Sequence, residues 1–591
     1  RPGVRQRLQL TKTPAAGRAP DVLLGPWCVG GEVRGTPLLS EGAEPADFVA
    51  AARTFPGVFA RVVEALAGIF NETFGISRSA RYWALVTHPL LYHYLLSHLV
   101  KRSLVERALE GRAGGYEVPE AAPGPASVPL LYSDLRAAYE HDDRFNLELF
   151  SLVCRSLGVP GSSGRYRGHA AGGGAGIARR LRRAVLGAYA FSAAARRYRA
   201  HSRQRQLGED SVVFKDVDPA FARQLAERTG LRFVPIGEAV RLRPSLRTAT
   251  DEDLRTRVPW SHADPSIHAI LQGLQYHLPV HQVETFPRLL EEARGQLSRH
   301  GAPGALLFGL LERPDYRVFA AEAMERGARL VSIQHGGNYG ESIAAVSTVI
   351  ERYFSDRFVT FGWQEDPEKD VPAGGFRTLG LAPVPEPGPA PEPGSEGDVL
   401  LVAPFFQEYP HHLNWSPTAR HRERRGLLQA LPAAIRRRVV VRMRPGRTAS
   451  ARLEREWLAP FPELTIEEGR EAIGTLLGRS SLVIIGYVFS TTLLEVVKTD
   501  RPFVVFDSGF EALLTPNARP VYAALREAGL VHTEPVEAAR AVAEILVDVD
   551  GWWTEPARRR AVSRYRETFV KEARLEEWTE LMRDLALTVR S

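Results

Sequence analysis

The stretch that decides the fold is residues 305–341, which read ALLFGLLERPDYRVFAAEAMERGARLVSIQHGGNYGE. It contains a short apolar run at 305–309, a helical pattern over 319–327 and a second apolar run at 330–333. Two short apolar runs separated by a helix predict a βαβ unit, in which both strands belong to one parallel sheet. The glycine-rich turn that follows begins at the carboxyl end of the second strand, where open α/β sheets bind ligands.

The same alternation of strands and helices extends on both sides of this unit. In the first half of the chain the expected strands are 212–214, 232–234, 305–309, 330–333 and 358–360, and the expected helices are 219–229, 279–300 and 319–327. Further along, the expected strands are 399–402, 439–442, 482–485 and 503–506, and the expected helices are 417–430 and 492–498. The sequence therefore predicts an α/β fold with two Rossmann-type lobes whose strand ends face a shared cleft.

Changes in composition divide the 591 residues into five segments. The predicted segments are an N-terminal strand and helical region (1–127), a first lobe (128–382), a proline-rich linker (383–396), a second lobe (397–555) and C-terminal helices (556–591). A chain of this length exceeds the ~250–300 residues at which single cores stop growing, so several bodies are expected.

Finer features are predicted inside these segments. Residues 1–20 are expected to be an unstructured leader, followed by a buried strand at 22–28. Apolar residues at helical spacing predict helices from 45 to 109, interrupted near His88-Pro89. Another helix is expected at 139–157, and we expect the C-terminal helices to pack back across the hinge between the lobes.

The composition is that of a folded globular protein, with 44% hydrophobic and 25% charged residues. We find neither a signal peptide nor an apolar stretch of ~20 residues, the length that spans a membrane. The expected location is therefore the cytoplasm, with at most peripheral contact with the inner face of the membrane. The two cysteines, Cys28 and Cys154, lack the spacing of a zinc site, and no metal or other cofactor is expected.

The net charge of +7 is concentrated in one insertion, 161–206. It begins as a flexible glycine-rich stretch and continues, over 177–206, as a helix with nine arginines and no acid; without those nine the formal charge would be −2. Apolar residues such as Leu181 and Val185 on the other side are typical of an interfacial helix beside anionic lipid headgroups. We predict peripheral membrane contact here and no nucleic acid; a solvated helix or an RNA patch is the alternative.

The turn after the strand at 330–333 has the sequence QHGGNYGE over residues 334–341. Its glycines let the backbone approach a ligand, and its histidine and glutamate supply titratable groups at one strand end. The predicted catalytic residues here are His335 and Glu341, and the predicted substrate-binding residues are Gln334, Gly336, Gly337 and Tyr339. The alternative is a tight turn whose histidine only hydrogen-bonds the backbone.

Two strand ends of the second lobe suit a nucleotide. Residues 439–447, VVVRMRPGR, place three arginines at the end of a strand, and guanidinium groups bind phosphate or a sugar carboxylate through paired hydrogen bonds. Residues 485–495, IGYVFSTTLLE, lead into a helix whose first hydroxyl and N–H groups suit a phosphate, with a capping box expected between Thr492 and Glu495. The predicted nucleotide-binding residues are Arg442, Arg444, Pro445, Ser490, Thr491, Thr492 and Glu495. Solvated loop arginines and a plain helix cap are the alternatives.

Chemistry at this sheet edge would also need a group that takes up a proton. Besides the histidine, the candidates are Glu351, Asp356, Asp142, Asp143 and Glu148. The pattern does not choose among these acids; Asp356 is included with His335 and Glu341 in the predicted catalytic set.

Several motifs together resemble a bacterial family of transferases from surface-polysaccharide gene clusters. They are LLGPWC (23–28), YW (82–83), QHGGNYG (334–340), FGW (361–363) and WW (552–553). The second lobe is also similar to transferases that use CMP-activated ulosonic acids and to CDP-alditol polymerases, which share a basic-Pro strand end and a later S-T-x-x-x-E helix start. Those relatives usually carry His-Pro where this chain has Arg444-Pro445.

The resemblance implies a GT-B fold, with a cytidine nucleotide on the second lobe and an acceptor on the first, near His335. It implies a glycosyltransferase that moves a sugar, a Kdo-like or nonulosonic acid, from a CMP donor to a surface polysaccharide or lipid-linked acceptor. A CDP-alditol phosphotransferase is the nearest alternative. From another class comes a non-catalytic polysaccharide- or RNA-binding protein. An NAD-dependent oxidoreductase is disfavoured, because no glycine fingerprint follows a strand.

Overall fold

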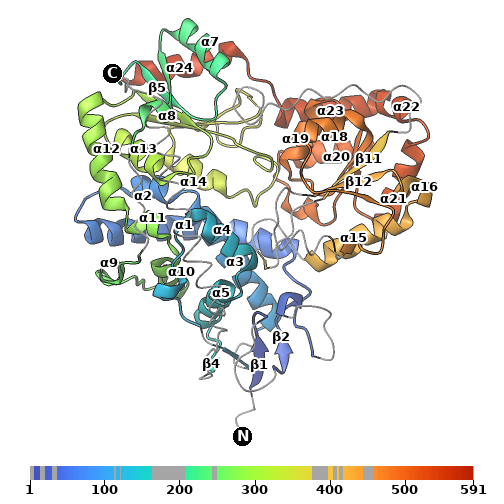
Figure 1. The fold of residues 1–591 in the computed structure, drawn as a ribbon, viewed down its shortest axis with the longest axis horizontal. Helices are drawn as coiled ribbons and strands as arrows, with labels where there is room; N and C mark the ends of the chain where they lie inside the picture. The colour runs from blue at the N-terminus through green and yellow to red at the C-terminus, as the bar shows by residue number, and fades with distance from the viewer. Residues whose placement is uncertain are drawn as a thin grey trace.

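We describe the protein from a computed structural model. The described residues are 5–12, 20–28, 36–111, 115–119, 121–162, 206–242, 249–375, 397–403, 409–410, 417–443, 455 and 457–589. Figure 1 shows a helical N-terminal region below two α/β lobes that lie side by side. The basic helix predicted at 177–206 and the linker predicted at 383–396 fall almost entirely outside the described residues.

The N-terminal region is built mainly from five helices. They are α1 (Pro45–Phe74), α2 (Ala80–Thr87), α3 (Leu90–Leu109), α4 (Tyr132–His141) and α5 (Asp143–Ser156). The chain breaks between α2 and α3 at His88-Pro89, where proline cannot continue a helix. Helices α9 (Glu252–Thr256), α10 (Pro265–His277) and α11 (Val280–Val283) join this region from later in the chain, and α10 packs on α5.

A small parallel sheet lies at the N-terminal end of this region. Its strands are β1 (Gln6–Gln9), β2 (Val22–Leu23), β3 (Tyr116–Pro119) and β4 (Gly161–Ser162), in the order β2-β1-β3-β4. The prediction of an unstructured leader is therefore wrong for residues 6–9, which pair with strands distant in sequence. The strand predicted at 22–28 is also shorter, because Pro26 begins a 3-10 turn, η1 (Pro26–Cys28).

The first lobe has a six-stranded parallel sheet in the order β10-β9-β8-β7-β5-β6. Its strands are β5 (Ser211–Phe214), β6 (Arg232–Pro235), β7 (Ala305–Phe308), β8 (Arg329–Ile333), β9 (Arg357–Val359) and β10 (Asp370–Val371). Its helices are α7 (Pro219–Thr229), α8 (Ile236–Ala239), α12 (Phe286–His300), α13 (Pro314–Met324) and α14 (Ser347–Phe354). The βαβ unit predicted from residues 305–341 is confirmed, because β7 and β8 are parallel neighbours.

The second lobe has another six-stranded parallel sheet, in the order β13-β12-β11-β14-β15-β16. Numbered within the lobe, this order is 3-2-1-4-5-6, the Rossmann order. Its strands are β11 (Asp398–Val402), β12 (Val439–Arg442), β13 (Thr465–Glu467), β14 (Ser480–Ile485), β15 (Phe503–Phe506) and β16 (Val531–His532). Its helices are α15 (Pro417–Ala430), α16 (Ala433–Arg436), α18 (Ile473–Arg479), α19 (Thr491–Lys498), α20 (Arg519–Glu527), α21 (Pro535–Ile545) and α22 (Val549–Thr554), with the 3-10 helix η4 (Phe510–Leu513).

The chain ends in two helices that lie on different lobes. Helix α23 (Pro556–Phe569) packs on α19 and α20 of the second lobe, and α24 (Leu575–Val589) packs on α7 of the first. Figure 1 shows α24 lying along α7, far from the rest of the second lobe. Trp578 is fully buried there and meets the edge of Phe221, with ring centroids 5.8 Å apart. The predicted return of the C-terminal helices toward the first lobe is therefore confirmed, while the hinge predicted at 383–396 lies outside the described residues.

Several predicted details differ from the structure. The helices predicted at 139–157 and 279–300 are each broken, at residue 142 and at residues 284–285. Helix α13 begins five residues before the predicted 319, because Pro314 fits the first turn of a helix. Helix α19 is capped by Ser490, whose side chain accepts from the Leu493 N–H at 3.2 Å, so the capping box expected between Thr492 and Glu495 is wrong. The edge strands β10, β13 and β16 were not predicted.

Candidate functional site

The glycine-histidine turn lies at the carboxyl edge of the first sheet, directly after β8. His335 keeps 26% of its side chain exposed. The Tyr339 hydroxyl lies 3.0 Å from His335 Nδ1 and donates to Glu351 Oε1 at 3.1 Å. This hydroxyl therefore connects the imidazole to a carboxylate on α14.

Glu351 is completely buried and is surrounded by two histidines. Its Oε1 lies 3.7 Å from His335 Nδ1 and 3.3 Å from Nε2 of His88, which stands at the junction of α2 and α3. Burial raises the pKa of Glu351 to about 7, with His335 opposing the rise. Burial also lowers the pKa of His335, and Glu351 opposes that fall. At pH 7 His335 is therefore a neutral base backed by a readily protonated carboxyl group.

The side chain of Gln334 fixes the turn through hydrogen bonds. Its Oε1 accepts from the Phe361 N–H at 3.0 Å and from the Trp363 indole at 2.8 Å, and its Nε2 donates to the Gly336 carbonyl at 2.9 Å. The FGW motif and the QHGG motif, distant in sequence, therefore contact each other. Because both polar atoms of its buried amide are engaged in the protein, Gln334 positions the turn.

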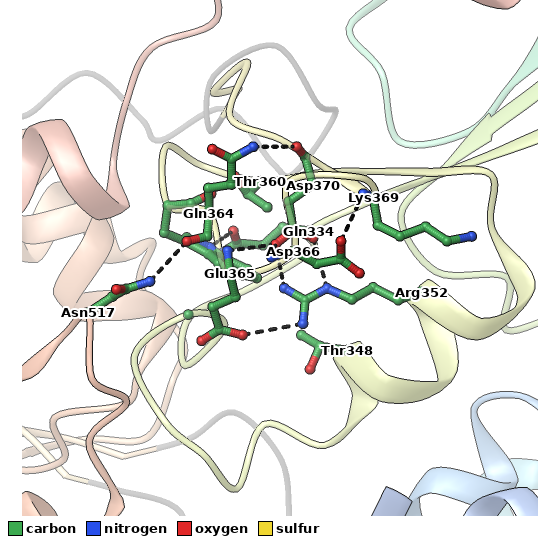
Figure 2. A network of polar contacts seen from close by, with 12 residues as sticks. Gln334, Thr348, Arg352, Thr360, Gln364, Glu365, Asp366, Lys369, Asp370 and Asn517 are labelled. Atoms are coloured by element: carbon green, nitrogen blue, oxygen red, sulfur yellow. Dashed lines mark hydrogen bonds and ion pairs between the residues drawn. The ribbon is translucent and has the colours of Figure 1, made fainter.

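An ion-pair network fixes the segment behind Gln334, as Figure 2 shows. Arg352 of α14 binds Asp370 through Nε at 2.8 Å and Nη2 at 2.6 Å, and reaches Glu365 at 3.2 Å. Gln364 accepts at its backbone carbonyl from Asn517 of the second lobe at 2.9 Å. The network thus stiffens the base of the turn and extends to the opposite lobe.

The turn of the first lobe touches the start of α19 in the second lobe. The Gly337 N–H donates to Thr491 Oγ1 at 3.1 Å. A Cβ on Gly337 would lie 2.6 Å from the Ser490 carbonyl carbon, so only glycine allows this approach. A Cβ on Gly336 would lie 3.3 Å from Thr491 Oγ1. The two glycines predicted to bind substrate therefore also bring the two lobes together.

Glu341 belongs to the same interlobe contact. Its buried carboxylate accepts from the hydroxyls of Tyr522 and Tyr565 in the second lobe at 2.7 and 2.6 Å, and from the Asn338 N–H at 3.2 Å. Burial raises its pKa to about 7. The backbone continues the contact, since Ile343 N–H donates to the Leu513 carbonyl at 2.8 Å. Glu341, predicted as catalytic, is placed by the structure between the lobes.

On the second lobe, Arg442 lies at the end of β12 and contacts Glu467 and the Glu471 carbonyl. Glu495 is half-buried one turn into α19, and burial raises its pKa to about 7 against the opposing charge of Arg442. Thr492 follows Thr491 in the first turn of the same helix. Arg444 and Pro445, the other predicted nucleotide residues, lie outside the described residues.

Two arginines that the sequence analysis missed lie at the same sheet edge. Arg420 and Arg424 of α15 are both 2% exposed. Arg420 pairs with Asp507, after β15, at 2.8 Å, and Arg424 donates to the Gly486 carbonyl, after β14, at 3.1 Å. Their spacing of four residues on one helix face was the available signal.

Another missed pair lies at the carboxyl edge of the first sheet. Lys215 and Asp216 directly follow β5, and Lys215 Nζ lies 2.7 and 2.6 Å from the two carboxylate oxygens of Asp216. Their position at the carboxyl end of a strand was the signal that could have found them, because open α/β sheets bind ligands at this edge.

The other predicted acids lie away from His335. Asp356 precedes β9, accepts from the Leu330 N–H at 2.8 Å and pairs with Arg81 at 3.0 Å. That is the amino end of the strands, opposite the turn, so we leave Asp356 out of the proposed site. The remaining three acids are engaged within the helical region: Asp142 caps α5, Asp143 accepts from the Lys12 N–H, and Glu148 contacts His277.

The family of the chain follows from a sequence comparison that covers nearly its whole length. The model of the LIC12162 family transferases matches residues 7–585. The chain belongs to this family of transferases. No curated protein matches it in sequence. Within the described residues, no helix has the length and apolar character needed to cross a membrane.

Solved structures show distant similarity. The wall teichoic acid polymerase TagF matches at 11% identity and TM-score 0.31, over 70% of this chain and 99% of its own. The UDP-GlcNAc 2-epimerase of Neisseria meningitidis matches at 8% and 0.34, over 64% and 99%. Anabaena HepE, in complex with UDP-glucose, matches at 12% and 0.34, over 64% and 99%. These similarities are too distant to assign an activity.

Proposed function

We propose that the protein is a glycosyltransferase of GT-B type, which moves a sugar from a nucleotide-activated donor to a hydroxyl group of an acceptor. The observation that carries the proposal is the contact between Gly337 and Thr491, which joins the carboxyl edges of the two sheets. Open α/β sheets bind ligands at this edge. Two substrates held by facing edges would have their reacting atoms close together. Membership of a transferase family agrees with this.

His335 is the proposed base on the first lobe. Burial lowers its pKa, so that the imidazole is neutral at pH 7 and can accept a proton. Tyr339 and Glu351 orient the ring, and the Glu351 carboxylate stabilises the imidazolium that forms. His335 is the residue of this cluster that keeps an exposed face, so it is the one that can meet the acceptor.

The reaction balances with groups from both lobes. The acceptor oxygen attacks the anomeric carbon of the donor while its proton passes to His335. The bond from that carbon to the donor phosphate breaks, and its electron pair leaves on the phosphate oxygen. N–H and hydroxyl groups of Ser490, Thr491 and Thr492 at the start of α19 would stabilise this charge. Arg442, Arg444 and Pro445 at the neighbouring strand end, with Glu495 on the ribose, complete the proposed nucleotide site.

The nature of the donor rests on the resemblance of the second lobe to enzymes that use cytidine nucleotides. We propose a CMP-linked Kdo-like or nonulosonic acid, because its carboxylate would be a second target for the guanidinium groups. The proposed acceptor is a surface glycan or a lipid-linked glycan at the inner face of the membrane, with residues 177–206 as the membrane contact.

Nucleotide binding tests the proposed function. Addition of CMP, CDP, UDP or GDP at about 100 times its dissociation constant stabilises a protein by about 2.7 kcal/mol, so at least one should raise the melting temperature. Thr492→Val should weaken this effect, whereas Thr499→Val, at the other end of α19, should leave it unchanged. If none of the four nucleotides stabilises the protein, the transferase proposal fails.

A further inference from the structure

The first sheet carries a pair of charged side chains at its own crevice, next to the His335 turn. Lys215 and Asp216 follow β5, which lies between β6 and β7. The chain passes from β5 to β6 on one side and then to β7 on the other, so the strand order reverses at β5. In doubly wound sheets the crevice at this reversal is the place where ligands bind.

Asp216 is held there in an unfavourable backbone conformation. Its φ of 65° lies in the left-handed region, which residues other than glycine adopt uncommonly. Its carboxylate is fixed by Lys215 Nζ and by the Leu310 N–H at 3.2 Å. Backbone strain of this kind is concentrated at ligand sites. Both side chains of the pair remain 27% exposed, so the carboxylate still reaches solvent.

Gly309 brings Asp216 beside His335. A Cβ at Gly309 would lie 3.2 Å from Asp216 Oδ2 and also 3.2 Å from His335 Cβ. One methyl group would therefore press on both residues. Because glycine follows β7, the carboxylate after β5 and the imidazole after β8 lie close together at the carboxyl edge of the sheet.

We propose that Asp216, fixed by Lys215, binds a hydroxyl group of a neutral acceptor sugar and directs the reacting hydroxyl toward His335. This inference rests on the proposed function and adds the class of acceptor to it. A carboxylate has about four lone-pair positions, and Lys215 and the Leu310 N–H use three of them, which leaves one position on Oδ1 for a sugar hydroxyl to donate to.

The charges around His335 favour a neutral sugar over an anionic one. Its charged neighbours are the carboxyl groups of Glu351 and Asp216 and the ammonium of Lys215. Both oxygens of Asp216 already neutralise that ammonium. Lys215 and Asp216 neutralise each other and Glu351 is buried, so the pair offers an anionic group no net positive charge, whereas a sugar hydroxyl gains a hydrogen bond to Asp216.

Direct binding of sugars tests the inference. Calorimetry and saturation-transfer NMR would compare methyl α-glucoside, methyl α-galactoside, methyl α-mannoside and N-acetylglucosamine with glucuronic acid and N-acetylneuraminic acid. We expect at least one neutral sugar to bind, and Asp216→Asn to weaken it at least about tenfold. Asparagine is among the residues that best tolerate the left-handed region, so the backbone should be kept. Gly309→Ala should weaken the binding of the same sugar.

Glu577→Gln is the matched control. Lys571 Nζ lies 2.9 and 2.8 Å from the Glu577 oxygens, and the two side chains are 27% and 32% exposed, much as in the proposed site. This variant should bind the sugar like the wild type. Equal affinities of wild type and Asp216→Asn, binding of anionic sugars alone, or no binding of any sugar would each overturn the inference. Nucleotide stabilisation, measured in the same samples, reports separately on the proposed function.

Discussion

Glu351 and Glu341 are two buried glutamates whose pKa burial raises to about 7, but their surroundings differ. Glu351 contacts the proposed base, His335, whereas Glu341 accepts hydrogen bonds from the hydroxyl groups of Tyr522 and Tyr565 in the other lobe. The same substitution at the two positions therefore separates a role in chemistry from a role in lobe contact.

Glu351→Gln should lower the transfer rate about 100-fold with little change in nucleotide binding, because His335 loses its orienting charge. The carboxylate raises the pKa of His335, so its removal lowers that pKa. Activity needs neutral His335 and falls as the pH drops through this pKa, so the acidic limb of the pH-rate profile should move to lower pH. An unmoved limb with a normal rate would contradict the role of Glu351.

Glu341→Gln should retain activity and change the pH dependence of stability. The folded pKa of Glu341, about 7, lies above its ordinary value of 4.5. The stabilisation from its bound proton is thus full below pH 4.5 and is lost as the pH rises through 7. The difference between the folded and the ordinary pKa of Glu341 corresponds to about 3 kcal/mol of stability. Glutamine stays neutral, so the variant should gain melting temperature relative to the wild type between pH 5 and 8. A constant difference would refute this.

Part of the site could be predicted from single residues. Gln334, His335 and Tyr339 were visible because a glycine-rich turn follows an apolar strand. The contact between His335 and Glu351 could not be predicted, because Glu351 is one of many acids in the sequence. It approaches His335 only when α14 packs beside β8. Asp216 was missed for a similar reason, since its closeness to His335 depends on Gly309 in a third strand end.

Among the elements, the start of α19 and the turn after β8 depend on each other. Gly337→Ala would place a methyl group 2.6 Å from the Ser490 carbonyl carbon and force the two apart. A displacement of about 1 Å at a reacting centre can cost 100-fold in rate, so transfer should fall by about that factor. Gly124→Ala, where a Cβ meets nothing within 4 Å, is the control. Normal activity of Gly337→Ala would show that this contact does not set the reacting geometry.

The central strands and several helices were predictable because each is a long enough apolar pattern. β5, β7, β8, β11 and β12 all lie within a residue or so of their predicted bounds. The edge strand β13 has three residues, with Ile466 40% exposed, so burial leaves no pattern there. β1 was missed because its four residues are defined by pairing with β2 and β3.

At the scale of the whole molecule, the C-terminal helices tie the lobes together. Trp578→Ala should destabilise the protein by about 3–5 kcal/mol, because its indole is fully buried against α7. Hydrogen exchange should then increase in residues 219–229 of the first lobe, although position 578 follows the second lobe in sequence. Faster exchange confined to α23 would contradict this docking.

The return of these helices could be predicted from their apolar faces, but the interlobe contact through residues 337–343 could not. That contact requires the loop after β8 to meet α19 and η4, which are more than 140 residues away in the sequence. The residues of these segments form no recognisable sequence pattern, and they come into contact only when the two lobes assemble.

A structure of the protein with a bound cytidine nucleotide tests the central claim most directly. The account predicts the phosphate at the start of α19, near Thr491 and Thr492, with the base on the second lobe and His335 facing the phosphate across the cleft. A nucleotide bound elsewhere, with His335 on a surface that does not face it, would contradict the account.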